Sequence, residues 1–299
     1  MTLIFPSFQS GEIDHELGLW ADVGLTAQFW VRDDDAVAVT PQLERLATLA
    51  RDHAVEIGLA VVPGRLQPDL SDRLNAGTSP FRPMCHGWVH ANHADQRSPA
   101  EFGVGRPVAD MRAELSRART VMADTFAIKA PFFVPPFGQI APALAEALPS
   151  LGFGGLSNQN PLYLSRLVRL AGARSWLLPP HLANRPVGAS RLDAHIDLID
   201  WQIATARDPA LVGSRLMGEL RIRRKGYVDH AAPIGLLGHH LVHDAAIWAL
   251  LDGLIGYLRS KPNVAFPGLA GLMQSFRVEQ PSARETGCGL PPSRASIPL

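Results

Sequence analysis

Short apolar segments alternate with helix-forming segments along most of this chain, and that alternation limits the available folds more than any other feature. Apolar runs such as 28–32, 56–62 and 81–86 have the length and content of buried strands. Segments 41–54 and 107–126 repeat their apolar residues with the 3.6-residue period of a helix. Strand and helix follow each other about seven times with short connections, which predicts parallel βαβ units.

The size of the chain suits one large α/β domain. The sequence has 299 residues, of which 46% are hydrophobic, enough for a sizeable core. We expect this domain to span residues 1–275 and to be followed by an irregular, proline-rich tail at 276–299. Candidate site residues fall just past several strand ends, which in a (β/α) barrel is the catalytic face. A doubly wound open sheet would also place ligands at strand ends.

Charge and cysteine content argue against several classes of protein. The 28 basic and 28 acidic residues leave a formal net charge of zero and form no basic stripe, so we expect no nucleic-acid partner. No signal peptide and no apolar run long enough to cross a bilayer are visible, which predicts no membrane association. Cys85 and Cys288 lie far apart and suggest no disulfide framework. We therefore expect a cytoplasmic protein; the sequence does not predict its oligomeric state.

Residues with metal-ligand chemistry gather in a few places. Seven of the 11 histidines fall within 86–93 and 230–243. His86 and His90 are four residues apart, a spacing that would place them on one side of a helical turn. The acidic run 33–35 directly follows an apolar strand. Two histidines and one carboxylate would leave a position for water, as in catalytic zinc sites. A surface turn that happens to carry histidines is the alternative for the histidine pair alone.

Five segments in this order resemble the five motifs of the polysaccharide deacetylase family, the NodB-homology or carbohydrate esterase family 4-like proteins. The resemblance covers roughly residues 25 to 260, and its first, second and fourth motifs are specific. The segments are Arg32-Asp33-Asp34-Asp35-Ala36, His86-Gly87-Trp88-Val89-His90, Val134-Pro135-Pro136-Phe137-Gly138, Asp197-Leu198-Ile199-Asp200-Trp201 and Leu237-Gly238-His239. The resemblance implies an atypical member of this family with a NodB-like fold, a distorted (β/α) barrel of about seven parallel strands.

The resemblance implies a divalent metal site. Asp35, His86 and His90 match the family's ligands, and two nitrogens with one carboxylate make zinc the first choice. Iron, cobalt, nickel or manganese would fit the same ligands. We expect Asp33 to be a solvated loop residue or a helix cap. A register shift that makes Asp33 the base and Asp34 the ligand stays open.

The resemblance also implies catalytic roles. Asp34 matches the base, and Asp200 matches the acid that orients the catalytic histidine, His239, which protonates the leaving nitrogen. The backbone N–H of Phe137 matches the donor that holds the oxyanion; a rigid turn is the alternative at this segment. His240 is the rival of His239. The residues expected to line the substrate site are Trp88, Pro136, Trp201 and His240.

The third motif departs from the family, which has an arginine where this chain has Val134. In the family that arginine tethers the base. Arg32 replaces the family's threonine and lies two positions before Asp34, on the same side of a strand. We hypothesise that Arg32 takes over the tether; the alternative is that it pairs with Asp33 or another acid at the rim.

These features predict a metal-dependent hydrolase of C–N bonds, of the deacetylase or amidohydrolase type. A divalent cation would polarise the carbonyl and lower the pKa of a water. The family implies an N-acetylated sugar, and the expected cytoplasmic location favours a small N-acyl or amide compound or a glycan precursor. The alternatives are a non-catalytic sugar-binding relative and an allantoinase-like cyclic amide hydrolase.

Overall fold

The computed structural model of the protein describes residues 10–159 and 191–275, and it is built on one parallel sheet. Its main path runs in the order β5 (Gly155–Leu156), β4 (Phe132–Val134), β3 (Phe81–His86), β2 (Ile57–Val61), β1 (Ala27–Ala36), β9 (Ile234–Gly238) and β6 (Ile196–Asp197). A further strand, β10 (Val264–Ala265), pairs in parallel with the start of β1. Parallel bridges from Leu156 to Arg191 and from Gln159 to Ala194 join β5 to the segment leading into β6. Hydrogen bonding therefore continues round the sheet, and the predicted distorted barrel is confirmed.

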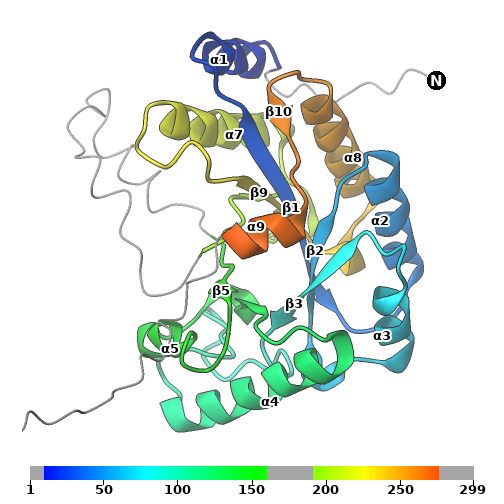
Figure 1. The fold of residues 1–299 in the computed structure, drawn as a ribbon, viewed down its shortest axis with the longest axis vertical. Coiled ribbons are helices and arrows are strands. Elements are labelled where there is room, and N and C mark those ends of the chain that lie inside the picture. Colours follow the sequence, from blue (N-terminus) through cyan, green and yellow to red (C-terminus); the bar gives the residue numbers. More distant parts are fainter. Residues whose placement is uncertain (1–9, 160–190, 276–299) are drawn as a thin grey trace, which may run out of the picture.

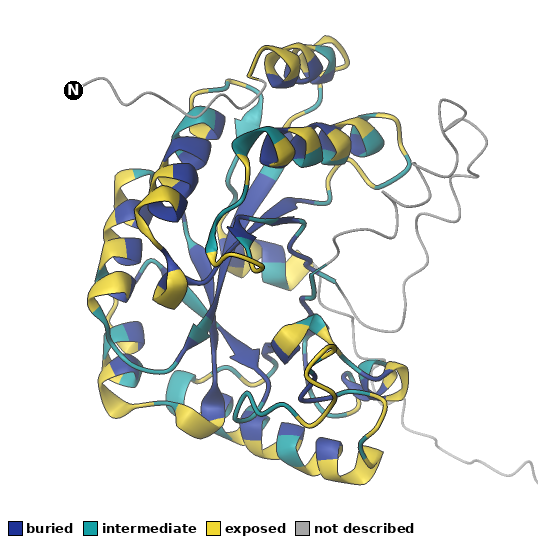
Figure 2. Ribbon diagram, turned by 180° about the vertical axis from the view of Figure 1, so that it is seen from behind, coloured by how far each residue is buried: buried dark blue, intermediate teal, exposed yellow. Residues whose placement is uncertain are grey.

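Helices surround this sheet, as Figure 1 shows. Their bounds are α1 (Ser10–Asp22), α2 (Pro41–Asp52), α3 (Pro68–Asn75), α4 (Val108–Phe126), α5 (Pro142–Ala147), α7 (Pro209–Arg224) and α8 (Ala245–Arg259), with short 3-10 turns η1 (Pro63–Arg65), η2 (Pro136–Gly138) and η5 (His240–Val242). Figure 2 shows that the helices bury one face and expose the other. Helix α2 begins as its sequence predicts: the Thr40 side chain accepts a hydrogen bond from Leu43 N–H, with Pro41 at the first helical position.

Helix α1 was not expected from the sequence. It buries Ile13, Leu17 and Trp20, which recur at the spacing of one helix face. The Trp20 indole donates to the carbonyl of Leu220 in α7, at 3.2 Å. Polar and acidic residues interrupt this short apolar face, so only its packing against α7 makes the pattern evident.

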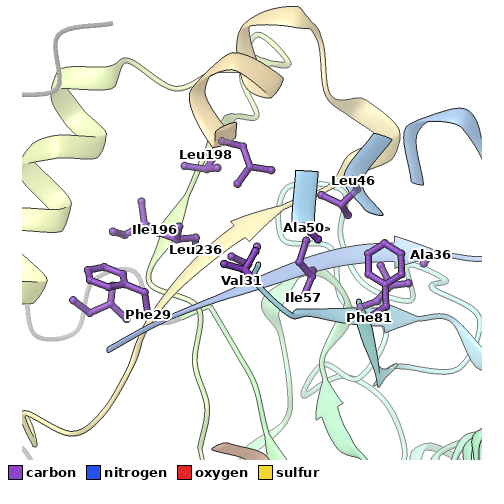
Figure 3. Close-up of a cluster of buried hydrophobic side chains, with 14 of the residues drawn as sticks. Phe29, Val31, Ala36, Leu46, Ala50, Ile57, Phe81, Ile196, Leu198 and Leu236 are labelled. Carbon is purple, nitrogen blue, oxygen red and sulfur yellow. The ribbon is translucent and has the colours of Figure 1, made fainter. Parts of the chain in front are cut away.

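Both faces of the sheet are buried. Alternate residues of each strand point to opposite sides, so one set packs outside the barrel and the other packs inside it. On the outer face, Phe29 and Val31 of β1 belong to a large apolar cluster that extends to Leu46 of α2 (Figure 3). Inside the barrel, a second apolar cluster contains Trp30, Ala60, Met84, Phe132, Val134 and Leu192. The short helix α9 (Leu269–Ser275) adds Leu269 and Leu272 to that interior cluster and so closes the end where the strands begin.

The segment 194–199 has the apolar content of one strand but is divided in the structure. Its first part is β6, in the barrel, whereas β7 (Ile199–Asp200) turns away to form an antiparallel hairpin with β8 (Thr205–Ala206). Another segment whose sequence favours a strand, 175–178, and the tail expected at 276–299 lie outside the described residues. Among the helices that the structure describes, none has the length and apolar character needed to span a membrane.

Candidate metal centre and active site

Strand β1 carries its acidic residues to the carboxyl end of the barrel. Arg32 and Asp34 project to one side of the strand, and Asp33 projects to the other. At Asp35 the backbone has a φ of 74°, and the pairing of β1 with β2 shifts register between Asp33 and Ala36. This break in the strand lets two adjacent carboxylates, Asp34 and Asp35, reach the same site.

Asp35, His86 and His90 converge on one point. Oδ1 of Asp35 lies 3.0 Å from Nε2 of His86 and 3.1 Å from Nε2 of His90, and the three ligand atoms all lie within 4.8 Å of one another. Nδ1 of His86 is 3.0 Å from the carbonyl oxygen of Val134, an interaction that directs the other ring nitrogen toward the centre. Tetrahedral zinc with its usual bond lengths needs donors about 3.3 Å apart. The chemistry and spacing of this donor set therefore fit a divalent metal.

Asp35 and His86 each stabilise the charged form of the other. Burial acts to raise the pKa of Asp35, but hydrogen bonds from His86 and His90 outweigh it and hold that pKa well below its usual range. Burial acts to lower the pKa of His86, and the carboxylates of Asp35 and Asp34 outweigh it and raise that pKa. The structure thus keeps a negative charge at the point where a cation would bind.

The histidine pair does not lie on a helical turn, and that prediction is wrong. His86 is the last residue of β3, and His90 lies in the loop that follows. Gly87 and His90 have φ values of 66° and 58°, left-handed conformations that reverse the path of the chain. This path brings the two imidazole rings to a centroid separation of 5.1 Å. A Cβ on Gly87 would lie 2.1 Å from Oε2 of Glu101 and 2.4 Å from Cγ of Pro136.

Arg32 holds Asp34 with two hydrogen bonds. Its Nε lies 2.9 Å from Asp34 Oδ1 and its second terminal nitrogen lies 3.0 Å from Oδ2. The first terminal nitrogen donates to both the carbonyl and the hydroxyl of Ser157, at 3.0 and 2.9 Å. Val134, at the position of the family's arginine, belongs to the apolar interior of the barrel. The Arg32–Asp34 contact predicted from the two-residue spacing is present.

His239 follows β9 directly and faces the same carboxylate. Its Nε2 lies 3.9 Å from Oδ2 of Asp34, and the ring of Trp201 meets the imidazole edge-on at a centroid distance of 4.7 Å. The backbone N–H of His239 donates to Nε2 of His243 at 3.0 Å. The other ring nitrogen of His239 is buried and has no hydrogen-bond partner in the part of the chain that the structure describes. Asp34, His239 and Trp201 therefore lie together.

Asp200 does not orient His239, which corrects the expected pairing. Its side chain caps the turn of the β7–β8 hairpin by accepting the N–H of Gln202 at 3.0 Å, and no hydrogen bond or ion pair joins it to His239 within residues 10–159 and 191–275. The neighbouring acid, Asp197, accepts the indole N–H of Trp201 at 2.8 Å. The reason is the division of this segment, because the hairpin carries Asp200 away from the barrel.

Asp33 and His240 form a second, fully buried pair. The backbone N–H of His240 donates to Asp33 Oδ2 at 2.8 Å, and the ring Nδ1 contacts Oδ1. The two side chains are 1% and 0% exposed. Burial acts to lower the pKa of His240, but the Asp33 carboxylate outweighs it and raises that pKa. Asp33 is therefore not a solvated acid, and the expectation that His240 lines the substrate site is wrong.

Phe137 offers a backbone donor beside the metal ligands. Its φ is 58°, and its ring lies 4.4 Å from that of His90. Gly138 N–H donates to the carbonyl of Pro135, whereas Phe137 N–H makes no hydrogen bond with the residues that the structure describes. Positive φ at Asp35, His90 and Phe137 costs about 1–3 kcal/mol each, a strain typical of functional sites.

Two of the expected substrate contacts have supporting positions instead. The ring of Trp88 packs beside Gly64 and beneath the guanidinium of Arg117, 5.1 Å above it, against the outer core. Pro136 is buried against Gly87. Trp201, by contrast, is half exposed beside His239. No motif predicted Glu101, whose buried carboxylate binds the backbone of the histidine loop.

Comparison with known proteins supports the fold described above. No family model matches the sequence, and no curated protein resembles it. A solved structure from Mycobacterium smegmatis, of a protein to which polysaccharide deacetylase activity has been attributed, has a TM-score of 0.57 at 16% identity and covers 86% of this chain and 94% of its own. A family 4 carbohydrate esterase from Streptomyces lividans, solved with acetate, has a TM-score of 0.48 at 14% identity and covers 86% of this chain and 100% of its own.

A further solved structure is that of a mutant of a pseudoenzyme from carbohydrate esterase family 4. Its TM-score is 0.48 at 14% identity, covering 85% of this chain and 70% of that one. The chain has the fold of the polysaccharide deacetylases, as the motif resemblance implied. Because one fold hosts many functions, the function must be argued from the site.

Proposed function

We propose that this chain is a metal-dependent hydrolase of C–N bonds, deacetylase-like, that acts on an N-acyl or amide group of a small molecule or oligosaccharide. The observation that carries the proposal is the convergence of Asp35, His86 and His90, with Asp34 and His239 beside them. Two imidazole nitrogens and one carboxylate favour zinc among the divalent metals.

Each residue of the site has a chemical task in this proposal. Asp35, His86 and His90 would hold a divalent cation, which would supply polarisation of the carbonyl and a lower pKa for water. Asp34, fixed by Arg32, accepts a proton from the attacking water.

Two further groups act on the substrate itself. Phe137 N–H donates to the carbonyl oxygen as negative charge develops on it. His239, which lies beside Asp34, donates a proton to the leaving nitrogen, while Trp201 forms the adjoining wall.

A non-catalytic binding protein is the second candidate, and one observation favours it: the motif arginine is replaced by Val134. The bidentate contact of Arg32 with Asp34 favours catalysis instead, because it supplies a tether from another position. The two candidate functions therefore predict different results in the same assay.

The test measures metal content and turnover together. Protein loaded with zinc is incubated with acetylated chito-oligomers, small N-acetyl compounds and cyclic ureides, and release of acetate or amine is followed. Asp34→Asn and His239→Gln should each lower kcat by about 100- to 10,000-fold, the usual contribution of a general base or acid. His53→Gln is the matched control, because His53 also pairs with an aspartate, Asp252, but on the outer helices.

The outcomes separate the candidates. Stoichiometric zinc with turnover that depends on Asp34 and His239 supports the hydrolase. Substrate binding without turnover supports the binding protein. Wild-type protein that takes up no divalent metal contradicts the metal-dependent proposal.

A further inference from the structure

Glu101 is a buried carboxylate that lies inside the histidine loop. Its side chain is shielded from solvent, with 0% exposure of the residue. Oε2 accepts the backbone N–H of Trp88 at 3.1 Å. Oε1 accepts the N–H of Val89 at 2.8 Å and that of Ala91 at 3.4 Å. One carboxylate oxygen thus binds the residues on both sides of His90.

These contacts act where the loop is strained. His90 has a φ of 58°, a conformation that costs free energy for a residue with a side chain. Glu101 gives three backbone donors of this turn their acceptor, and buried or half-buried N–H groups without one are costly. Because a Cβ on Gly87 would lie only 2.1 Å from Glu101 Oε2, the carboxylate and the loop are in close contact.

Among the described residues, the carboxylate of Glu101 accepts hydrogen bonds from backbone N–H groups, and the guanidinium of Arg106 interacts with its charge without contacting it. No ion pair of its carboxylate occurs among the described residues. Arg106 donates to the main-chain carbonyl of Glu101 and pairs its guanidinium with Glu114. A buried carboxylate that faces only backbone N–H groups is stabilised further when a cation binds at the neighbouring His90.

We propose that Glu101 is a positioning residue of the metal centre, which fixes the His86–His90 loop and strengthens divalent metal binding through its negative charge. This inference rests on the proposed function, because it needs a metal at Asp35, His86 and His90. Groups that orient metal ligands usually contribute 10- to 100-fold to metal affinity or activity. We expect an effect of about that size from Glu101.

The test compares three variants with the wild-type chain. Glu101→Gln keeps the shape but removes the charge and turns an N–H₂ group toward backbone donors. Glu101→Asp keeps the charge on a shorter side chain. Glu16→Gln is the matched control, because Glu16 is also buried but pairs with Arg224 on the far side of the fold, between α1 and α7.

The readouts are zinc affinity by calorimetry, the visible spectrum of the cobalt-substituted protein and thermal unfolding without metal. Glu101→Gln should bind zinc about 10- to 100-fold more weakly, and its cobalt spectrum should differ from that of the wild type. The zinc affinity of Glu101→Asp should lie between those of Glu101→Gln and the wild type. Glu16→Gln should unfold at a lower temperature yet bind zinc as the wild type does. If Glu101→Gln does not fold, Glu101→Asp decides.

The failure of this inference can be told from the failure of the proposed function. Unchanged zinc affinity and cobalt spectrum in the folded Glu101 variants, with a wild type that binds zinc, overturns the role of Glu101 alone. A wild type that binds no zinc overturns both proposals. A wild type that binds zinc but hydrolyses nothing overturns only the hydrolase, and the affinity of the Glu101 variants still decides this inference.

Discussion

Three adjacent aspartates of β1 have three different partners. Asp33 pairs with His240 on the outer side of the strand, Asp34 pairs with Arg32, and Asp35 lies between His86 and His90. The alternation of a strand separates the first two, and the positive φ of Asp35 brings the third back toward the second. A single broken strand thereby supplies both a candidate base and a candidate metal ligand.

The pairing of Arg32 with Asp34 leads to a first prediction. Arg32→Thr leaves a buried carboxylate without its cation, so the free energy of unfolding should fall by about 3–5 kcal/mol. Turnover should also fall, because the base loses its fixed orientation. Adding Val134→Arg recreates the family's arrangement and should restore part of both quantities. Chemical denaturation and kcat measure the effects, with Val134→Arg alone as the control; an Arg32→Thr variant as active as the wild type would contradict the tether.

His243 gives a prediction about pH. Burial lowers its pKa to about 4, although the carboxylates of Asp33 and Asp244 act in the opposite direction. In the folded state the ring stays neutral and accepts the N–H of His239. Between pH 6.5 and 4 the unfolded chain takes up a proton at His243 that the folded chain does not. Stability should therefore fall as the pH decreases through this window, by at most about 3 kcal/mol from this residue.

The contribution of His243 is isolated by difference. His243→Gln can still accept the hydrogen bond but does not titrate. Between pH 6.5 and 4, its free energy of unfolding, measured by denaturant titration at several pH values, should decrease less than that of the wild type. Parallel curves for the two proteins would show that His243 does not titrate in this way.

At the scale of elements, the loops after the strands decide which residues meet. The loop after β3 brings His90 back to His86, and η2 places Phe137 against His90. The β7–β8 hairpin places Trp201 beside His239 but keeps Asp200 away. Thr205 of this hairpin also contacts Asp244, the N-cap of α8, so the wall of the site is attached to a helix.

Gly87 tests the importance of the path of the histidine loop. Gly87→Ala places a Cβ too close to Glu101 and Pro136 in a left-handed conformation, so the loop must move. We expect a loss of about 1–3 kcal/mol in unfolding free energy together with weaker zinc binding. Gly105→Ala is the control, since a Cβ there meets no atom within 4 Å. Equal zinc affinities and stabilities for the two variants would show that the loop tolerates the shift.

At the scale of the whole molecule, the candidate metal centre connects strands that are distant in sequence. Asp35 comes from the end of β1, and His86 from the end of β3, with β2 between them. A ligand that binds only the folded state stabilises it, because it withdraws folded protein from the unfolding equilibrium. Binding of a metal at the carboxyl end of the barrel should therefore increase the stability of the folded protein.

Metal-linked stability provides a global prediction. Zinc at 100 times its dissociation constant should stabilise the protein by about 2.7 kcal/mol, and a chelator should reverse the effect. Asp35→Ala and His86→Ala should abolish the response, whereas His53→Gln should retain it. Thermal unfolding with and without zinc measures the shift. A shift that persists in Asp35→Ala would place the metal elsewhere.

Periodic features explain why much of this fold and part of its site could be predicted from the sequence. Continuous apolar runs identified most strands of the barrel, and the 3.6-residue period identified most of its helices. The alternation of side chains along a strand predicted the Arg32–Asp34 contact. Thr40 and Pro41 marked the start of α2. These features depend on neighbours in the chain, so they are present before it folds.

Contacts between distant segments could not be predicted in this way. The burial of His240 against Asp33, the departure of Asp200 on a hairpin and the position of Glu101 inside the histidine loop depend on the path of the backbone through left-handed residues and turns. The sequence by itself determined the order of most strands and helices and which acids and histidines follow the strands, because apolar runs and helical periodicity are local features of the chain. Only the tertiary structure decided which of those side chains meet, because their partners come from loops whose course is determined by packing against the rest of the barrel.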